Sequence, residues 1–238
     1  MSKIQFENRG VYHLYNRGVE KRDVFSDDND RWRFLQGLFL FNDVELSANV
    51  LWQVERNFGR ATFKTIKNFL PKQKRRPLVR LMTDCLMPNH YHLLVEQIED
   101  NGVSKFMQKI GTGYTIYFNK KHDRVGPLFQ GAFRAVAVED DEQLKYLLFY
   151  INVINPGQLL EPNLKEKHIA SSKKIMSFVA DYSWSTHQEY SGRRDSFIVD
   201  KGLLGEIFST PKEYLDFVKS CWEERIRPTK SVGRLFLE

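Results

Sequence analysis

The sequence predicts an α+β fold in which helices pack on a mostly antiparallel sheet. Strand-like and helix-like segments follow one another in the order β-α-β-β-α-β-α, which is typical of one sheet covered by helices. The two central strand candidates, residues 78–87 and 90–97, are separated only by Pro88-Asn89, as in a strand pair joined by a turn. With 42% apolar residues, the chain can also form a substantial core.

In the first half of the chain, strand-like and helix-like segments alternate. Residues 10–18 (GVYHLYNRG) mix β-branched, aromatic and polar positions and predict a strand. Residues 26–43 begin with Ser and Asp capping candidates and continue with apolar residues at helical spacing. Residues 44–76 predict a partly helical excursion that ends in a basic cluster bracketed by prolines. The strand pair 78–87 and 90–97 then follows.

The second half predicts two further helices around a strand. Residues 104–122 carry apolar and aromatic side chains at helical spacing, and 128–138 predict a strand with a glycine kink. Residues 139–157 begin with acids, which suit a helix N-terminus, and the helix should stop at Asn155-Pro156. We therefore expect a core domain over 1–157, with 44–76 inserted, and a helical C-terminal extension over 158–238.

Charge and cysteine content narrow the class of protein. The net charge is +6 and the isoelectric point is about 9.2, which suits a polyanionic partner and equally an ordinary basic surface. Cys85 and Cys221 are far apart and form no metal-binding pair. The N-terminus lacks an apolar signal core, and no apolar run could span a bilayer. These features predict a soluble cytoplasmic protein without a membrane partner.

The string CLMPNHYHLLVEQ (85–97) places two histidines on one strand face. His90 and His92 are two residues apart, so their side chains project together, as two ligands of one divalent cation must. A histidine-triad hydrolase would need a third histidine at Leu94, and neither His-x-Ser/Thr pairs nor His-Glu-x-x-His occur. Two interpretations therefore remain: a metal site, or two strand histidines that are hydrogen-bonded to the backbone.

An ordered set of segments resembles a known family. The N-terminal YHLYNRG is followed by an Asp-x-x-Arg-Phe-Leu helix, and four segments come later in this order: MPNHYHLLVE, YFNKKHDRVGPLFQGAFRA, FYINVINPG and YSWSTHQEY. Together they resemble the single-tyrosine HUH transposases, closest to the REP-associated, IS200-like group. The resemblance implies an antiparallel-sheet HUH nuclease core, a ferredoxin- or RRM-like sandwich with helices packed on the sheet.

The resemblance also implies an activity: cleavage and rejoining of single-stranded DNA near hairpins. A tyrosine would attack a backbone phosphate and keep the 5′ phosphate as a phosphotyrosine, freeing a 3′-hydroxyl. Mg²⁺ or Mn²⁺ on His90 and His92 would hold the phosphate in line and polarise it. A free phenol has a pKa of about 10, so a nearby cation would have to favour the phenolate.

The family pattern, Tyr-x-x-x-Asn-Pro, predicts Tyr150 as the nucleophile and Asn155 as the third metal ligand. Here the spacing is five residues instead of four, which in an α-helix turns the two side chains about 140° apart instead of about 40°. A helical bulge could absorb the extra residue, or Pro156 could push Asn155 out of the helical region. Tyr146, one turn earlier on the same face, is the rival nucleophile.

Candidate DNA contacts fall in or beside the matched segments, where basic, amide and aromatic side chains suit phosphate contact and base stacking. They are Asn16, Arg17, Arg22, Arg124, Phe129, Gln130 and Arg134. The basic loop 72–76 could add salt-dependent affinity. For each of these residues a solvated surface position is the alternative.

Three functions stay open. The resemblance favours a metal-dependent single-strand endonuclease and strand transferase, cytoplasmic and nucleoid-associated. A domesticated protein that binds hairpin DNA without cutting is favoured by the irregular spacing of Tyr150 and Asn155. A metal-dependent nuclease that uses water would cleave without any tyrosine. We expect a monomer or a homodimer whose partner is single-stranded DNA with hairpins.

Overall fold

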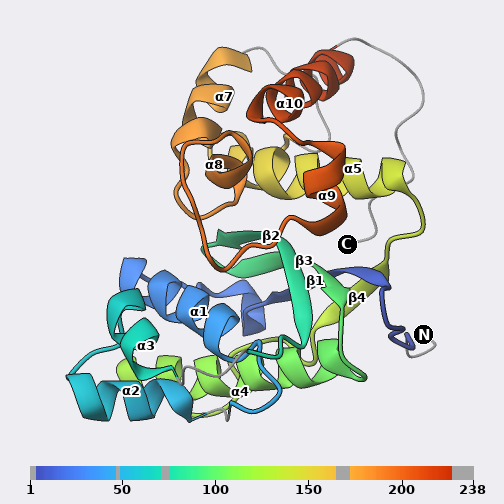
Figure 1. Ribbon diagram of the computed structural model, residues 1–238. Coiled ribbons are helices and arrows are strands. Elements are labelled where there is room, and N and C mark those ends of the chain that lie inside the picture. Colours follow the sequence, from blue (N-terminus) through green and yellow to red (C-terminus); the bar gives the residue numbers. More distant parts are fainter. Residues whose placement is uncertain (1–3, 47–48, 71–74, 165–171, 227–238) are drawn as a thin grey trace.

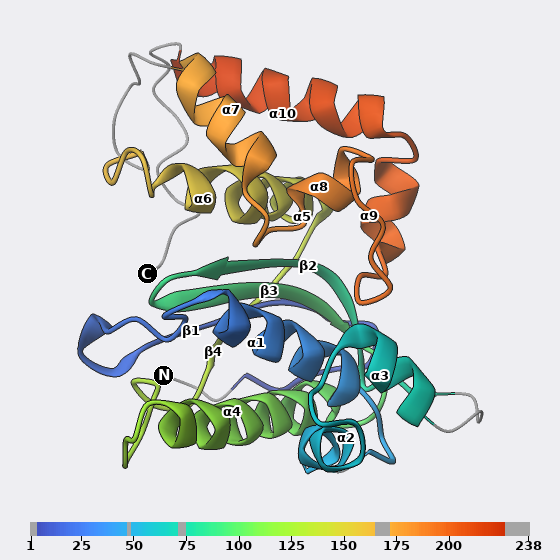
Figure 2. The same ribbon diagram turned by 90° about the vertical axis from the view of Figure 1, so that its left-hand side faces the viewer.

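The computed structural model describes residues 4–46, 49–70, 75–164 and 172–226. A single sheet lies between two layers of helices, with α1 to α4 on one face and α5 to α10 on the other (Figures 1 and 2). The predicted α+β class is confirmed, because helices cover an entirely antiparallel sheet.

The sheet has the strand order β2-β3-β1-β4. Its strands are β1 (Val11–Arg17), β2 (Val79–Met87), β3 (His90–Gln97) and β4 (Arg134–Ala137). With one helical crossover before β2 and another, α4, before β4, this order is that of a ferredoxin-like sandwich. The strand expected over 128–138 is confirmed only for its last part. Residues 128–133 form a loop, in which the carbonyl of Gly131 accepts a hydrogen bond from the side chain of Asn16 (3.0 Å).

The first helical layer buries the apolar side of β1 and β3. It contains α1 (Asp28–Leu40) and α4 (Gly102–Lys121). Helix α1 begins where the side chain of Asp27 accepts a hydrogen bond from the amide of Asp30, as the Asp-rich start of this segment predicts. Phe34 of α1 packs against Tyr91 of β3, with ring centroids 4.8 Å apart.

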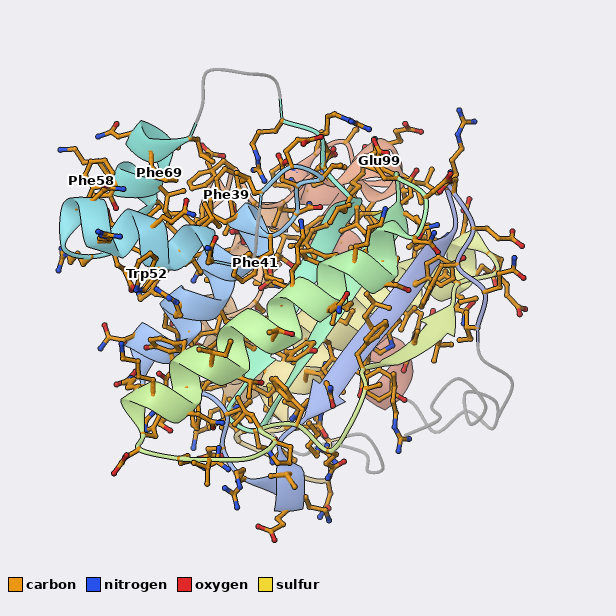
Figure 3. The ribbon with its side chains drawn as sticks, turned by 90° about the horizontal axis from the view of Figure 1, so that it is seen from below. Phe39, Phe41, Trp52, Phe58, Phe69 and Glu99 are labelled. Carbon is orange, nitrogen blue, oxygen red and sulfur yellow. The ribbon has the colours of Figure 1, made fainter. Side chains whose placement is uncertain are left out.

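The excursion over 44–76 forms two short helices beside this layer, α2 (Val50–Phe58) and α3 (Phe63–Phe69). Figure 3 shows Trp52, Phe58 and Phe69 on these helices at one corner of the molecule. In the predicted basic loop, Arg75 is bound to Asp43 and to main-chain carbonyls, while Arg76 pairs with Glu45 and Glu99. The rest of that basic cluster, Lys72 and Lys74, lies outside the described residues.

The second helical layer covers the opposite face of the sheet. It contains α5 (Asp141–Phe149), the π-helical turn η2 (Tyr150–Ile154), α6 (Asn155–Gly157), α7 (Ser172–Asp181), α8 (His187–Tyr190), α9 (Gly202–Ile207) and α10 (Pro211–Ile226). Met82 and Leu94 of the sheet share one apolar cluster with Ile151 of η2 and with Val218 and Trp222 of α10. The C-terminal segment is therefore packed onto the element that carries Tyr150.

The string YSWSTHQEY runs along the outer edge of β2. The amide of Leu86 donates to the carbonyl of Trp184 (2.8 Å), and the amide of Thr186 donates to the carbonyl of Asp84 (3.1 Å). The hydroxyl of Thr186 donates to Asn152 Oδ1 of η2 (2.8 Å). This segment therefore protects an edge strand and, through Thr186, also anchors η2.

Asp84 should make stability depend on pH. Burial and the nearby carboxylate of Glu189 raise the pKa of Asp84 to about 7, although Arg194 opposes this rise. Between about pH 4 and pH 7 the folded protein thus holds a proton that the unfolded chain has lost, so the free energy of unfolding falls as the pH rises through this window. We expect Asp84→Asn to be more stable than the wild type at about pH 8, by on the order of a few kcal/mol.

Urea unfolding at about pH 5 and about pH 8 measures this difference. Asp216→Asn, on the exposed side of α10, is the matched control and should leave the pH dependence unchanged. An Asp84→Asn protein that loses as much stability as the wild type between the two pH values would contradict the assignment.

Among the residues that the structure describes, no helix is both long and apolar enough to cross a membrane. Cys85 is buried and Cys221 partly buried, and both are free thiols, as their separation in the sequence predicts.

Candidate functional site

The histidine pair lies on the face of β3 that points towards the second helical layer. His92 is completely buried, whereas His90, at the start of the strand, is partly exposed. Their ring centroids are 5.0 Å apart, and the ring planes are nearly perpendicular at 87°. The two imidazoles therefore project from one face, as the spacing of two residues predicts.

Both imidazoles are held through Nδ1. Asn89 Oδ1 accepts a hydrogen bond from His90 Nδ1 (2.6 Å), and the Asn89 amide group is itself oriented by donating to the carbonyl of Lys21 (3.1 Å). The Nδ1 atom of His92 lies 2.9 Å from Nε2 of His13 on the neighbouring strand β1. For His90, the hydrogen bond fixes the neutral tautomer with the proton on Nδ1, so that Nε2 keeps a lone pair that can bind a metal.

Tyr150 opens the π-helical turn and faces these histidines. Its ring packs edge-on against His92 (centroids 5.6 Å apart) and against His13 (6.3 Å). The side chain is only 2% exposed. Tyr146, the rival nucleophile, is partly buried one turn earlier, and its ring lies near that of Phe149 (centroids 6.2 Å apart). The ring contacts thus associate the histidines with Tyr150.

The π-helical turn accommodates the spacing of five residues between Tyr150 and Asn155. The amide of Asn155 donates to the carbonyl of Tyr150, a hydrogen bond that spans five residues instead of four. Such a turn brings residues five apart onto the same side of the helix. Asn155 keeps helical dihedral angles (φ −58°, ψ −56°), so the bulge, and not displacement by Pro156, absorbs the extra residue.

The donor set fits a divalent cation with mixed nitrogen and oxygen ligands. His90 Nε2 has a lone pair, and Asn155 is completely buried, with Oδ1 accepting only a 3.2 Å bond from Gln158 and with no described hydrogen-bond partner for Nδ2. Oδ1 has a second lone pair that a cation could use, whereas the Nδ2 donor could serve only an acceptor such as a phosphate oxygen. Over the described ranges, no group of three or more His, Cys, Asp or Glu side chains could hold a metal, so a third protein ligand beside the two histidines would have to be of another kind, such as an amide oxygen.

A cavity of about 390 Å³ opens beside His90. It gathers four of the expected DNA contacts: its lining is Tyr15, Asn16, Arg17, His90, Gln130, Gly131, Ala132 and Arg134. None of these lining residues is acidic, and two are arginines. The cavity therefore combines the positive charge and the amide groups that a nucleic-acid backbone requires.

The other three expected contacts lie elsewhere. Phe129 is only 7% exposed and packs against Tyr91, so its ring offers little surface to a base. Arg22 is paired with Glu20, and Arg124 binds Asn119 at the end of α4. We therefore leave these three residues out of the proposed DNA surface.

Two residues of the site were missed in the sequence. His13 and Asn89 orient His92 and His90, respectively, yet neither was singled out. The alternation of YHLYNR contained a signal for His13, because His13, Tyr15 and Arg17 must share one strand face. The pairing of that face with His92 depends on the strand order, which no local pattern gives.

A comparison with protein families gives one match that spans both the histidine pair and Tyr150. A family model described as "Transposase IS200 like" matches residues 51–153. Over these residues the chain matches the IS200-like transposases. The family expected from the ordered motifs is thereby confirmed for this segment, and the match supports a transposase-type function.

The IS200-like match includes His90, His92, Tyr150 and Arg134, whereas His13, Asn155 and the C-terminal helices lie outside it. No curated protein matches the chain. Among solved structures, a REP-associated tyrosine transposase bound to a REP hairpin is similar, with 13% sequence identity and a TM-score of 0.45 over 84% of this chain and 94% of that chain.

Proposed function

We propose that this IS200-like protein cleaves and rejoins single-stranded DNA near hairpins, with Tyr150 as the nucleophile. The observation that carries the proposal is the packing of the Tyr150 ring against His92 and His13, in a segment that matches a transposase family. A tyrosine and a histidine pair, each on its own rigid element, suit a covalent phosphoryl transfer.

In the proposed step, the phenolic oxygen of Tyr150 attacks a backbone phosphate. A bond forms between this oxygen and phosphorus, and the bond to the 3′ oxygen breaks. The phenol loses its proton, and the departing 3′ oxygen gains one. The 5′ phosphate stays on the tyrosine, so that attack by another 3′-hydroxyl reverses the step and joins two strands.

His90, His92 and Asn155 would hold a divalent ion, Mg²⁺ or Mn²⁺. When bound, the ion supplies charge stabilisation and in-line orientation for the phosphate. Asn89 and His13 orient the two imidazoles, and the bulge in η2 keeps Asn155 on the side of Tyr150. These contacts fix the donors before DNA arrives, which lowers the cost of assembling the site.

The DNA strand would pass through the cavity beside His90. Arg17 and Arg134 would contact phosphates there, and Asn16 and Gln130 would offer amide groups to bases or sugars. Histidines and tyrosine come from the same chain, so one chain can supply the whole site, and we propose a monomer acting on chromosomal DNA. The extension 158–238 would brace the helix that carries Tyr150.

Denaturing gel electrophoresis after reaction with labelled single-stranded DNA tests the proposal. The DNA pool carries hairpins with varied flanking sequences, and Mn²⁺ is present. A labelled protein band shows the phosphotyrosine. Cleavage without such a band would leave a nuclease that uses water, and the covalent mechanism would fail.

The 2% exposure of Tyr150 favours a second candidate function, hairpin binding without cleavage. A phosphate reaches this hydroxyl only if neighbouring side chains move. Binding across the DNA pool, with neither cleavage nor a covalent band, would select this alternative.

Arg134 provides a test of the DNA path. Its side chain is exposed on the edge strand β4, so Arg134→Gln should leave the fold intact. If Arg134 neutralises one phosphate, the slope of log affinity against log salt should become shallower by about 0.7, with similar weakening for all sequences.

Fluorescence anisotropy with single-stranded DNA at several salt concentrations gives this slope. Lys212→Gln, an exposed residue of α10, removes the same charge far from the cavity and should leave the slope nearly unchanged. Equal slopes for Arg134→Gln and the wild type would place the DNA elsewhere.

A further inference from the structure

His13 sits next to the proposed metal site without being one of its expected ligands. It lies in the middle of β1, buried, and its ring stacks on that of His92 with centroids 5.1 Å apart and planes 19° apart. His13 Nε2 and His92 Nδ1 are 2.9 Å apart, within hydrogen-bond distance. Strands β1 and β3 are direct neighbours, so this contact is fixed by the sheet itself.

We propose that His13 is a positioning residue whose Nε2 accepts a hydrogen bond from Nδ1–H of His92 and thereby leaves the lone pair of His92 Nε2 for the metal. The inference rests on the metal site of the proposed function. It adds a role for a strand, β1, that lies outside the matched family segment.

The argument follows from the two tautomers of neutral imidazole. Each ring has one N–H donor and one acceptor nitrogen, so a bond between His13 and His92 leaves two arrangements. If His92 donates through Nδ1, its Nε2 keeps a lone pair and can bind a metal. If His13 donates instead, the proton of His92 is on Nε2, and that atom can no longer act as a ligand.

The neighbouring histidine shows which arrangement the site uses. Asn89 Oδ1 can only accept, so His90 must donate through Nδ1 and present Nε2. Two ligands of one ion must both present a lone pair, and Nε2 is the ring nitrogen that remains on each histidine once Nδ1 is engaged by Asn89 or His13. His13 would thus do for His92 what Asn89 does for His90.

The position of His13 also argues against its being a ligand itself. Its Nε2 is directed at His92 Nδ1, so the same atom cannot coordinate an ion. Groups that orient metal-bound histidines in this way typically change metal affinity about 10–100-fold when they are removed.

The first experiment reads the tautomer without metal or DNA. Nitrogen-15 NMR of the imidazole groups in the full chain at about pH 8 distinguishes Nδ1–H from Nε2–H. We expect His92 to carry its proton on Nδ1 in the wild type and to lose this preference in His13→Leu. A wild-type His92 protonated on Nε2 would overturn the proposal.

The second experiment measures Mn²⁺ binding by calorimetry. His13→Gln keeps an acceptor at the same bond distance from Cα as Nε2, whereas His13→Leu has none. We expect Kd to rise about 10–100-fold for His13→Leu and to return most of the way towards the wild-type value for His13→Gln. His122→Gln, on the other face of the sheet, is the matched control and should bind as the wild type does.

The outcomes distinguish failure of the positioning role of His13 from failure of the metal site itself. If Leu and Gln at position 13 weaken binding equally, His13 only fills space and the positioning role fails. If the wild type binds Mn²⁺ no better than His90→Ala, the metal site fails, while the NMR result still reports the bond between His13 and His92. If His13→Leu does not fold, the wild-type tautomer and the His13→Gln titration still decide.

Discussion

Tyr150→Phe should abolish the covalent protein–DNA adduct and lower strand cleavage by roughly 10⁴-fold or more, as removal of a nucleophile typically does. The substitution removes one oxygen and keeps the ring that packs against His92. Binding of hairpin DNA should therefore survive. The gel assay with labelled single-stranded DNA and Mn²⁺ measures both the adduct and the cleaved product.

Tyr146→Phe is the matched control, because it removes the same oxygen one helical turn away. It should retain the adduct and at least most of the cleavage. Loss of the adduct with Tyr146→Phe but not with Tyr150→Phe would show that the nucleophile had been assigned one turn too late.

His90→Ala should lower Mn²⁺ affinity by about 100-fold or more and remove cleavage together with rejoining. His90 is only partly buried, so the substitution opens no large cavity in the core, whereas His92 is fully buried. The loss should therefore come from the missing ligand and not from unfolding. Calorimetric Mn²⁺ titration and the gel assay measure the two effects on the same preparations.

The thermal unfolding midpoint of His90→Ala should stay close to that of the wild type in the absence of metal. In excess Mn²⁺ the wild type should gain stability that the variant does not, because a ligand bound only to the folded state stabilises it. Equal stabilisation of the two proteins by Mn²⁺ would place the ion at another site.

The strands and long helices were predictable because their signals are local. Residues 90–97 alternate within a strongly apolar run, and Asp27 caps α1 from a cluster of acids. The shared face of His90 and His92 follows from the same alternation. In the loop 128–133, by contrast, the side chain of Asn16 and the residues around Gly131 replace the expected ladder, which is a tertiary effect.

The partner of His92 depends on which strands are neighbours. His13 is 79 residues away in the chain, and only the order β3-β1 brings the two rings together. The role of Thr186 is equally non-local, since its hydroxyl reaches Asn152 across the interface between the C-terminal segment and η2. Contacts of this kind carry no periodic signal, so a sequence pattern does not reveal them.

The widened turn at Tyr150–Ile154 also affects how relatives of this protein can be found. In a regular α-helix, one added residue rotates all the following side chains around the helix axis. A π-helical turn confines the added residue to one turn, so that the side chains before and after it can still lie on the same side of the helix. A sequence motif that requires the tyrosine four residues before Asn-Pro would not match this chain, in which Tyr150 is five residues before Asn155. Distant relatives should therefore be sought with a gap of four or five residues, and those with the longer gap should share the five-residue hydrogen bond.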